Sequence, residues 1–197
     1  MRHTYHHGDL ARALVDQAVV ILGESGADGL TLKEAAKRAG VSHAAIYRHY
    51  ADKHALLVAV AERGFERFSL AFAAALESAP KPSRAAFLHV GRAVAAFALA
   101  EPVLYRVIFS GIKTWTVEEL AQAPAESAFG RMLVFVRDLQ HAKVLKRADP
   151  VRQAMAMWSI THGLASLALT GALPAAPDAL LPLADQVHAA LLDGLSP

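Results

Sequence analysis

Apolar residues return along this chain with the period of an α-helix. Leucine, alanine, valine and isoleucine recur at every third or fourth position. No stretch alternates apolar and polar residues between turn signals, as a half-buried strand would. The pattern therefore predicts an all-α fold. The expected helices cover residues 9–25, 31–40, a short stretch after 42, 52–78, 83–100, 102–110, 117–143, 149–171 and 178–194.

Residues suited to helix ends support these boundaries. Asp9 is placed to cap the first helix, and Gly26 and Gly29 are placed to end it. Thr31 and Glu34 have the spacing of a capping box, in which two side chains satisfy two backbone amides. The second helix is therefore expected to begin at Thr31.

The long helix expected at 52–78 is the most suitable place for a domain boundary. The stretch 80–83 contains two prolines and ends that helix. We place the boundary within the helix rather than at the prolines, because such a helix can begin in one domain and continue into the next. This predicts an N-terminal three-helix domain of residues 1–60 and a C-terminal helical domain of residues 61–197.

The stretch 31–50 meets the requirements of a helix-turn-helix. Two short helices that cross closely need a small residue at the crossing, and Ala36 is suitable. The turn needs a residue that tolerates positive φ, which Gly40 does. Ile46 can fill the crossing, and Val41 can close the turn. The alternative is a plain helical hairpin within a bundle.

The polar residues of the second short helix favour DNA reading over a plain hairpin. His43, Tyr47, Arg48 and His49 are hydrogen-bonding groups that a helix packed only on its own protein would not need to expose. Lys53 lies in the first turn of the next helix, where the helix dipole disfavours a cation. It is either an ordinary solvated lysine or, together with the free amides of that turn, a ligand for a DNA phosphate. The neighbouring helix-turn-helix favours the phosphate.

Composition adds little positive evidence for DNA binding. The net charge of the 197 residues is only +2, but six histidines in the first third would make this region more basic when protonated. These histidines are His3, His6, His7, His43, His49 and His54.

Other features of the sequence exclude several classes of protein. The absence of cysteine excludes disulfides and cysteine-ligated metal sites. The polar start and the interrupted apolar stretches predict a soluble cytoplasmic protein without a membrane span. There is no nucleophile motif and no phosphate-binding glycine loop, so we expect neither an enzyme nor a cofactor. His3, His6 and His7 are expected to form a flexible arm rather than a metal site.

Several motifs resemble those of the TetR family of transcriptional regulators. The stretches Tyr5–Leu10, Thr31–Tyr50 and Lys53–Leu57 resemble its DNA-binding domain, and the similarity covers residues 5–65. Phe97–Ser110 and Trp158–Gly163 resemble a subgroup with a Trp-His-Gly signature in the regulatory domain. The resemblance implies a homodimeric repressor that a small ligand releases from a palindromic operator on double-stranded DNA.

The resemblance also implies a role for each matching residue of the helix-turn-helix. Thr31, Tyr47 and Lys53 would hold phosphates, and His49 would lie beside the DNA backbone.

Four further positions, Lys33, His43, Ala44 and Ala45, would face base edges. Ala44 and Ala45 are smaller than the residues of many members, so they offer only apolar contact, for example to a thymine methyl. Hydrogen bonds to bases must then come from His43, Lys33 or Arg48.

The C-terminal 120 residues suggest that the protein has a role beyond DNA binding, since an architectural DNA-binding protein would not need them. Trp158 and His162 lie four residues apart on one helical face. They either pack in the core or line an effector pocket with Phe97, Tyr105 or Phe109. Apolar walls with few polar groups would suit a small, mostly apolar ligand.

Two apolar stripes near the C-terminus are candidates for the dimer interface. The last helix carries one of them, and small residues on the preceding helix would permit close approach. The alternative is that both stripes face the core of their own subunit. The stripes consist of Leu180, Ala184, Val187 and Leu191 and of Ala165, Ala168 and Gly171.

Overall fold

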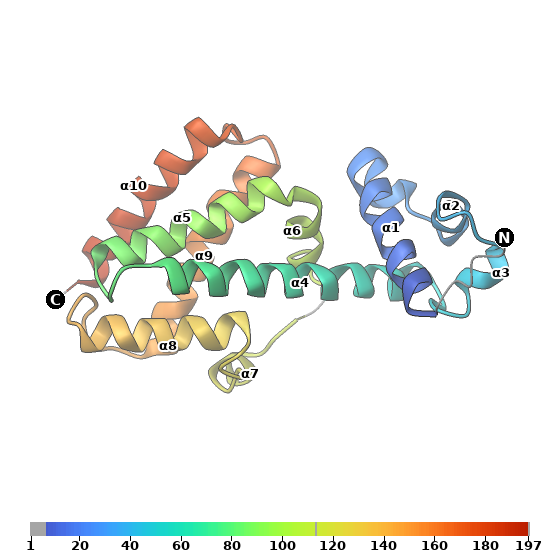
Figure 1. Ribbon diagram of the computed structural model, residues 1–197. Coiled ribbons are helices and arrows are strands. Elements are labelled where there is room, and N and C mark those ends of the chain that lie inside the picture. The colour runs from blue at the N-terminus through green and yellow to red at the C-terminus, as the bar shows by residue number, and fades with distance from the viewer. Residues whose placement is uncertain (1–6, 113, 197) are drawn as a thin grey trace. The chain divides into compact units, whose positions relative to one another are not determined.

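The computed structural model describes residues 7–112 and 114–196, with side chains from Leu10 onward. These residues form helices joined by turns, which confirms the all-α fold (Figure 1). The histidine arm and the cap expected from Asp9 lie outside the described residues or side chains. The helices are α1 (His7–Gly29), α2 (Leu32–Arg38), α3 (His43–Ile46), α4 (Lys53–Ser78), α5 (Arg84–Ala100), α6 (Pro102–Ile108), α7 (Val117–Ala121), α8 (Ala128–His141), α9 (Pro150–Leu169) and α10 (Pro177–Leu195).

The described chain divides into two compact units. The first contains residues up to Phe65 and also residues 103–112, and the second contains residues 66–102 and 114–196. The division after Phe65 falls inside α4. Most of α6 therefore belongs to the same unit as the helix-turn-helix, although the intervening residues 66–102 belong to the second unit.

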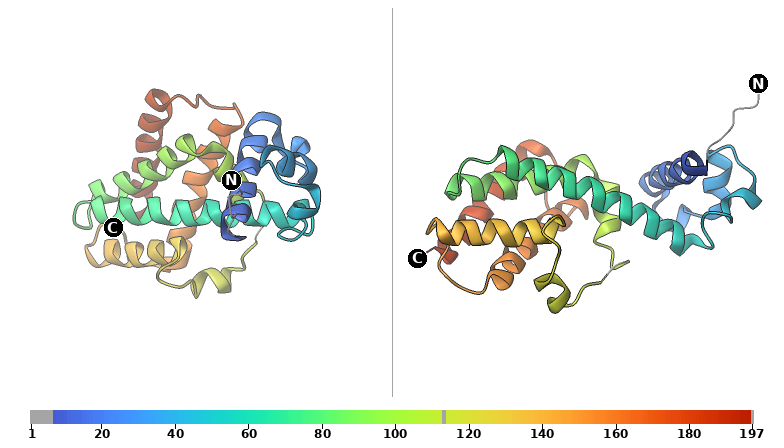
Figure 2. Two further views of the ribbon diagram at one scale, coloured as in Figure 1. Left: turned by 45° about the vertical axis from the view of Figure 1, so that its right-hand side comes forward. Right: turned by 60° about the horizontal axis from the view of Figure 1, so that its bottom comes forward.

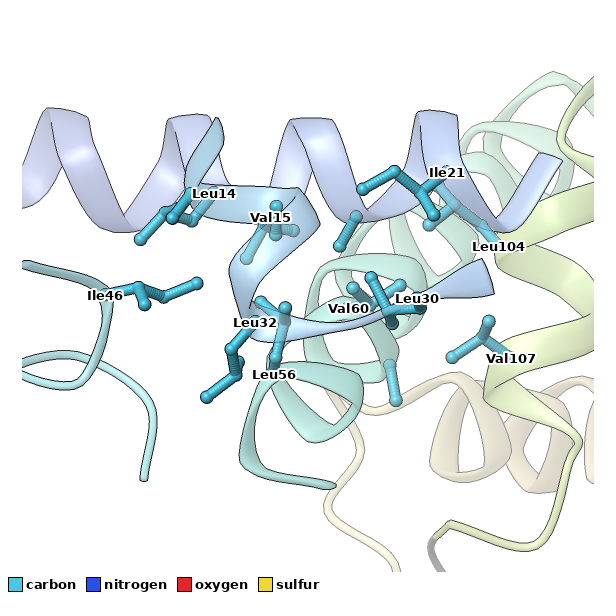
Figure 3. Close-up of a cluster of buried hydrophobic side chains, with 14 residues drawn as sticks. Leu14, Val15, Ile21, Leu30, Leu32, Ile46, Leu56, Val60, Leu104 and Val107 are labelled. Atoms are coloured by element: carbon cyan, nitrogen blue, oxygen red, sulfur yellow. The ribbon is translucent and has the colours of Figure 1, made fainter. Parts of the chain in front are cut away.

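The first unit has one apolar core, to which α6 contributes (Figure 3). Leu14 and Ile21 of α1, Ile46 of α3 and Leu56 of α4 are almost fully buried. A Cβ atom added at Gly64 of α4 would lie only 2.4 Å from Ile108 Cγ2, so glycine lets α6 approach closely. The remaining buried members are Val15, Ala18, Leu30, Leu32, Ala35, Ala36, Val60, Ala61, Leu104 and Val107.

Two expected helices differ from those in the structure. The first extends to Gly29 instead of ending near residue 25, but it is kinked at Gly26, whose φ of 66° and ψ of −168° are not helical. The helix expected at 117–143 is two helices, α7 and α8. Pro124 lies between them, and Ser127 starts α8 by accepting a hydrogen bond from the amide of Gly130.

Helices α5, α9 and α10 form the core of the second unit, and α8 packs on α9 (Figures 1 and 2). Leu180 and Ala184 of α10 are fully buried against this unit's own residues, as is Ala168 of α9. Ala165 of α9 is fully buried as well. The expectation that these four residues line a dimer interface is therefore wrong. An apolar stripe alone does not indicate which neighbour covers it.

A polar pair is buried where these three helices meet. The ring of His188 is about 1% exposed. Its Nδ1 lies 2.6 Å from the carbonyl of Ala184, and its Nε2 lies 2.7 Å from Oγ1 of Thr161. Because a carbonyl only accepts, Nδ1 carries a proton. Burial lowers the pKa of His188, while the Ala184 carbonyl and the charge of Asp185 partly oppose the shift.

Acidification is expected to destabilise this unit through His188. A lowered pKa means that below pH 6.5 the unfolded chain binds the proton and the folded chain does not. The stabilising contribution is therefore complete above pH 6.5, and at lower pH it falls by up to about 1.4 kcal/mol per pH unit. Denaturant unfolding of His188→Gln should show a smaller loss between pH 7.5 and 5.5 than the parent. The exposed His89→Gln serves as control, and equal losses in all three proteins would contradict the prediction.

Candidate nucleic-acid interface

Local contacts fix the start of α2 and the turn that follows it. Thr31 Oγ1 accepts a hydrogen bond from the amide of Glu34 at 3.1 Å, as the sequence predicted. The side chain of Glu34 accepts from Arg38 at 2.9 Å, so the described hydrogen bonds contain only one half of the expected capping box. Gly40 has a φ of 69°, and the amide of Val41 reaches back to the carbonyl of Ala36 at 3.0 Å. The predicted helix-turn-helix turn is confirmed.

Helix α3 begins at a second cap and is anchored by one residue. Ser42 Oγ accepts from the amide of Ala45 at 3.2 Å. Ile46 is completely buried, as expected for the residue that fills the crossing. On the outside, Tyr47 is 51% exposed and meets His43 edge to face, with ring centres 5.0 Å apart. The anchored helix thus holds His43 and Tyr47 in a defined arrangement.

Two open grooves follow the surface of the helix-turn-helix. The first, here the Lys53 groove, has a volume of about 390 Å³. It is lined by Asp28, Leu30, Thr31, Leu32, Lys33, His43, Tyr47, Ala51, Asp52 and Lys53.

The second, here the Lys37 groove, has a volume of about 590 Å³. It is lined by Thr31, Lys33, Glu34, Ala36, Lys37, Val41 and His43.

The Lys53 groove brings together five of the nine residues predicted from the sequence to contact DNA. All three candidates for phosphate binding are among them, and so are Lys33 and His43. The four other candidates line neither groove. Ala44 lies on α3 with its side chain exposed, Ala45 is half-buried, and Arg48 and His49 lie in the turn after α3.

The ammonium group of Lys53 is held in place by a backbone carbonyl. Its Nζ donates to the carbonyl of Ala27 at 2.5 Å. An ammonium has three N–H groups, so two can point to a DNA oxygen while the third holds the carbonyl. The start of α4 is already capped, because Asp52 accepts from the amide of Ala55 at 2.8 Å. The amides of that turn are therefore less available to a phosphate than the sequence suggested.

The sequence analysis missed Lys37. This side chain is 78% exposed and lines the second groove. Lys33 and Lys37 lie four residues apart on α2, and this spacing was the signal that could have identified the pair.

The five ligand candidates from the sequence are divided between the two units. Tyr105 and Phe109 belong to the first unit, where their ring centres lie 4.8 Å apart and burial raises the pKa of Tyr105. Phe97, Trp158 and His162 belong to the second unit.

In the second unit these candidates have different neighbours. Phe97 packs against Phe68 at 5.3 Å. Trp158 contacts Trp115 at 6.3 Å and Phe129 at 5.8 Å, again between ring centres. Half-buried His162 lies 3.3 Å from Ser166 Oγ, and burial lowers its pKa.

The described part of the chain contains no single helix that is long and apolar enough to cross a membrane. The bent pair of α5 and α6 meets the length and composition criteria only when both helices are taken together. Among the described side chains, no three or more His, Asp or Glu residues are grouped as metal ligands.

The fold and the grooves define the class as helix-turn-helix proteins with an open, polar surface over the motif. Residues 14–60 match the family model for bacterial regulatory proteins of the tetR family, and residues 87–191 match the tetracyclin repressor-like C-terminal domain. The chain therefore belongs to the TetR family, whose members are DNA-binding regulators of transcription and not enzymes.

Solved structures share this fold. A protein of unknown function from Rhodococcus sp. RHA1 is 30% identical over the whole of both chains, with a TM-score of 0.80. The TetR-family regulator PfmR from Thermus thermophilus is 20% identical, covering 93% of this chain and 99% of its own, with a TM-score of 0.66. The fatty acid degradation regulator FadR from Bacillus halodurans is 18% identical, covering 97% and 98%, with a TM-score of 0.69. No curated protein matches the chain.

Proposed function

We propose that this protein is a homodimeric cytoplasmic repressor that leaves a palindromic operator when a small, mostly apolar ligand binds. The observation that carries the DNA-binding part is the Lys53 groove. There the hydroxyl of Thr31, the phenol of Tyr47 and the ammonium of Lys53 meet in one hollow, beside Lys33 and His43. Hydroxyl and ammonium groups are typical phosphate ligands, and they position a protein on DNA without reading sequence.

The faces of α9 and α10 that are turned away from the core support a dimer. Leu167 is 48% exposed, and a Cβ atom added at Gly163 would meet nothing within 4 Å. On α10, half-buried Val187 shares the outer face with exposed Ala190 and Gly194. Small and apolar residues on two adjacent helices allow close packing in a four-helix interface. Light scattering at micromolar concentration should give twice the 21.0 kDa of the chain, and a monomer mass would contradict the dimer.

Selection of bound fragments from random DNA tests the operator part. A dimer with two reading helices should select a palindrome whose half-sites are spaced by whole helical turns of about 10 base pairs. An enriched site without two-fold symmetry would contradict the proposal, and so would the absence of any enriched sequence.

His43→Ala is expected to relax the base preference at one position of each half-site. His43 lines both grooves and carries a ring that can hydrogen-bond to a base edge, whereas alanine cannot. Discrimination at that position should fall by about 1–3 kcal/mol, measured as the change in the selected consensus. An unchanged consensus would exclude His43 as a base-reading residue. Lys81→Met, on the exposed turn after α4, is a suitable control because it should change no position.

The aromatic cluster around Trp158 supports an apolar effector. Trp115, Phe129 and Trp158 are all half-buried, and His162 can supply a hydrogen bond. Trp158, His162 and Gly163 all lie on α9, so the proposed Trp-His-Gly signature would contribute to this site. The name of the Bacillus halodurans regulator refers to fatty acid degradation, which is compatible with such a ligand. Because the chain has two tryptophans and both lie here, quenching of tryptophan fluorescence would report binding.

Ligand binding would be coupled to DNA affinity through α4 and residues 103–112. Helix α4 runs through both units, and α6 is packed on the helix-turn-helix unit. A Cβ atom added at Gly23 of α1 would lie 3.3 Å from Val103 Cγ2, so α6 and α1 are close at this point. A ligand with different affinities for two arrangements of these helices would shift DNA affinity by about 5- to 150-fold.

A further inference from the structure

The end of α1 and the end of α2 are joined by one side chain. Arg38, the last residue of α2, donates through Nε to Glu34 Oε1 at 2.9 Å. Through Nη1 it donates to Glu24 Oε2 of α1 at 2.6 Å. The guanidinium therefore binds a carboxylate of its own helix and another of the neighbouring helix. Charge-assisted bonds of this kind fix direction as well as distance.

The positive charge of Arg38 is paired with the carboxylates of Glu34 and Glu24. The hydrogen bond from Arg38 is the main cause of the lowered pKa of Glu34. The pKa of Arg38 is raised by its bonds to Glu34 and Glu24. Its side chain is only 30% exposed, whereas that of neighbouring Lys37 is 78% exposed. Lys37 is thus open to solvent, whereas the guanidinium of Arg38 is held by two carboxylates.

Helices α2 and α3 are fixed to each other, and the Glu24–Arg38 ion pair joins both of them to α1. The bond from Val41 to Ala36 closes the turn between them, and buried Ile46 fixes their crossing. The contact of Arg38 with Glu24 therefore adds a directional bond to the shared apolar core that packs α2 and α3 on α1. Close by, Lys53 holds the carbonyl of Ala27, so two cations hold the last turns of α1.

We propose that Arg38 is a positioning residue for DNA reading, which acts through Glu24 and touches no phosphate. The Glu24–Arg38 pair keeps α2 and α3 at the angle on α1 at which α3 fits the major groove. This inference rests on the proposed DNA-binding function, but its first test below needs no DNA.

Hydrogen exchange of the free full-length protein tests the ion pair itself. Arg38→Met and Glu24→Gln should each raise amide exchange in residues 32–47 by about 2- to 5-fold, because an exposed ion pair contributes only modestly to stability. Exchange in α9 should not change. Lys37→Met is the matched control, because Lys37 lies only 3.9 Å from Glu34 and is not described as bonded to α1. Equal exchange in Arg38→Met and Lys37→Met would overturn the proposal.

DNA binding then separates positioning from phosphate contact. Arg38→Met should weaken binding to the selected operator by about 2- to 5-fold, leave binding to a random-sequence duplex unchanged, and keep the slope of log affinity against log salt. Partial unfolding would weaken binding to both duplexes equally. The ratio of the two affinities therefore shows whether α3 is correctly positioned. Lys37→Met should instead weaken binding to both duplexes and reduce the slope of log affinity against log salt.

A double-mutant cycle tests whether Arg38 acts through Glu24. The double variant Glu24→Gln/Arg38→Met should bind operator no more weakly than Arg38→Met alone. Additive losses would overturn the proposal, and so would a salt slope reduced by about one per subunit in Arg38→Met. If the parent protein selects no operator at all, the proposed DNA function fails, while the exchange experiment still decides the role of the ion pair in α2 and α3.

Discussion

Lys53→Met is expected to weaken binding to operator and to random-sequence DNA by about 100-fold each. A charge-assisted hydrogen bond to phosphate contributes about 1.5 kcal/mol, and the dimer loses two of them. The loss is the same for both duplexes because phosphates carry no sequence information. Filter binding between 50 and 200 mM salt should show a slope of log affinity against log salt that is smaller by about one per subunit.

Controls are needed because Lys53 also holds the carbonyl of Ala27. Tyr47→Phe removes a neutral hydrogen-bond donor from the same groove. It should weaken binding to both duplexes by about 5-fold without changing the salt slope. Lys81→Met should have no effect on binding to either duplex. If Lys53→Met left the slope unchanged, Lys53 would serve only the end of α1, and the phosphate assignment would be wrong.

The helix-turn-helix was predictable because its requirements lie close together in the sequence. Gly40 must take a positive φ, Ser42 must cap α3, and Ile46 must fill the crossing. Each requirement depends on residues within one or two helical turns. Sequence periodicity and capping residues report such local conditions directly.

The failed half of the capping box shows the limit of local reasoning. Glu34 lies three residues after Thr31, as a capping box requires, and four residues before Arg38. Both partners are within reach of one carboxylate, and a charged guanidinium binds it more strongly than a backbone amide does. Arg38 is itself oriented by Glu24, which lies 14 residues away. The outcome therefore depends on a contact between helices that the spacing does not contain.

The packing of α6 and α10 was not predictable for a similar reason. Leu104 and Val107 form an apolar stripe that would look the same whichever core it faced. Leu180 and Ala184 share α10 with Val187 and Ala190, so apolar residues lie on more than one face. Hydrophobicity is not directional, and only the packed structure determines which face is covered. The grouping of residues 103–112 with the DNA-binding unit is therefore a structural result.

Gly91→Ala is expected to destabilise the second unit by about 1–3 kcal/mol. The added Cβ would lie 2.4 Å from Cδ2 and 2.5 Å from Nε2 of His188. The ring cannot easily move away, because the carbonyl of Ala184 and the hydroxyl of Thr161 hold both its nitrogens. Overpacking of a core costs about 1–3 kcal/mol, although alanine is the better helix former. Denaturant unfolding followed by circular dichroism measures the loss.

The His188→Ala background shows whether the clash with the ring is the cause. Without the ring, the added Cβ enters the space that the ring has left, so Gly91→Ala should cost nothing there or should stabilise by up to about 1 kcal/mol. Because the two residues are in contact, their effects should not be additive. If Gly91→Ala cost the same in both backgrounds, the close approach of α5 and α10 would not depend on His188. A gain in stability in the parent protein would contradict the predicted overpacking itself.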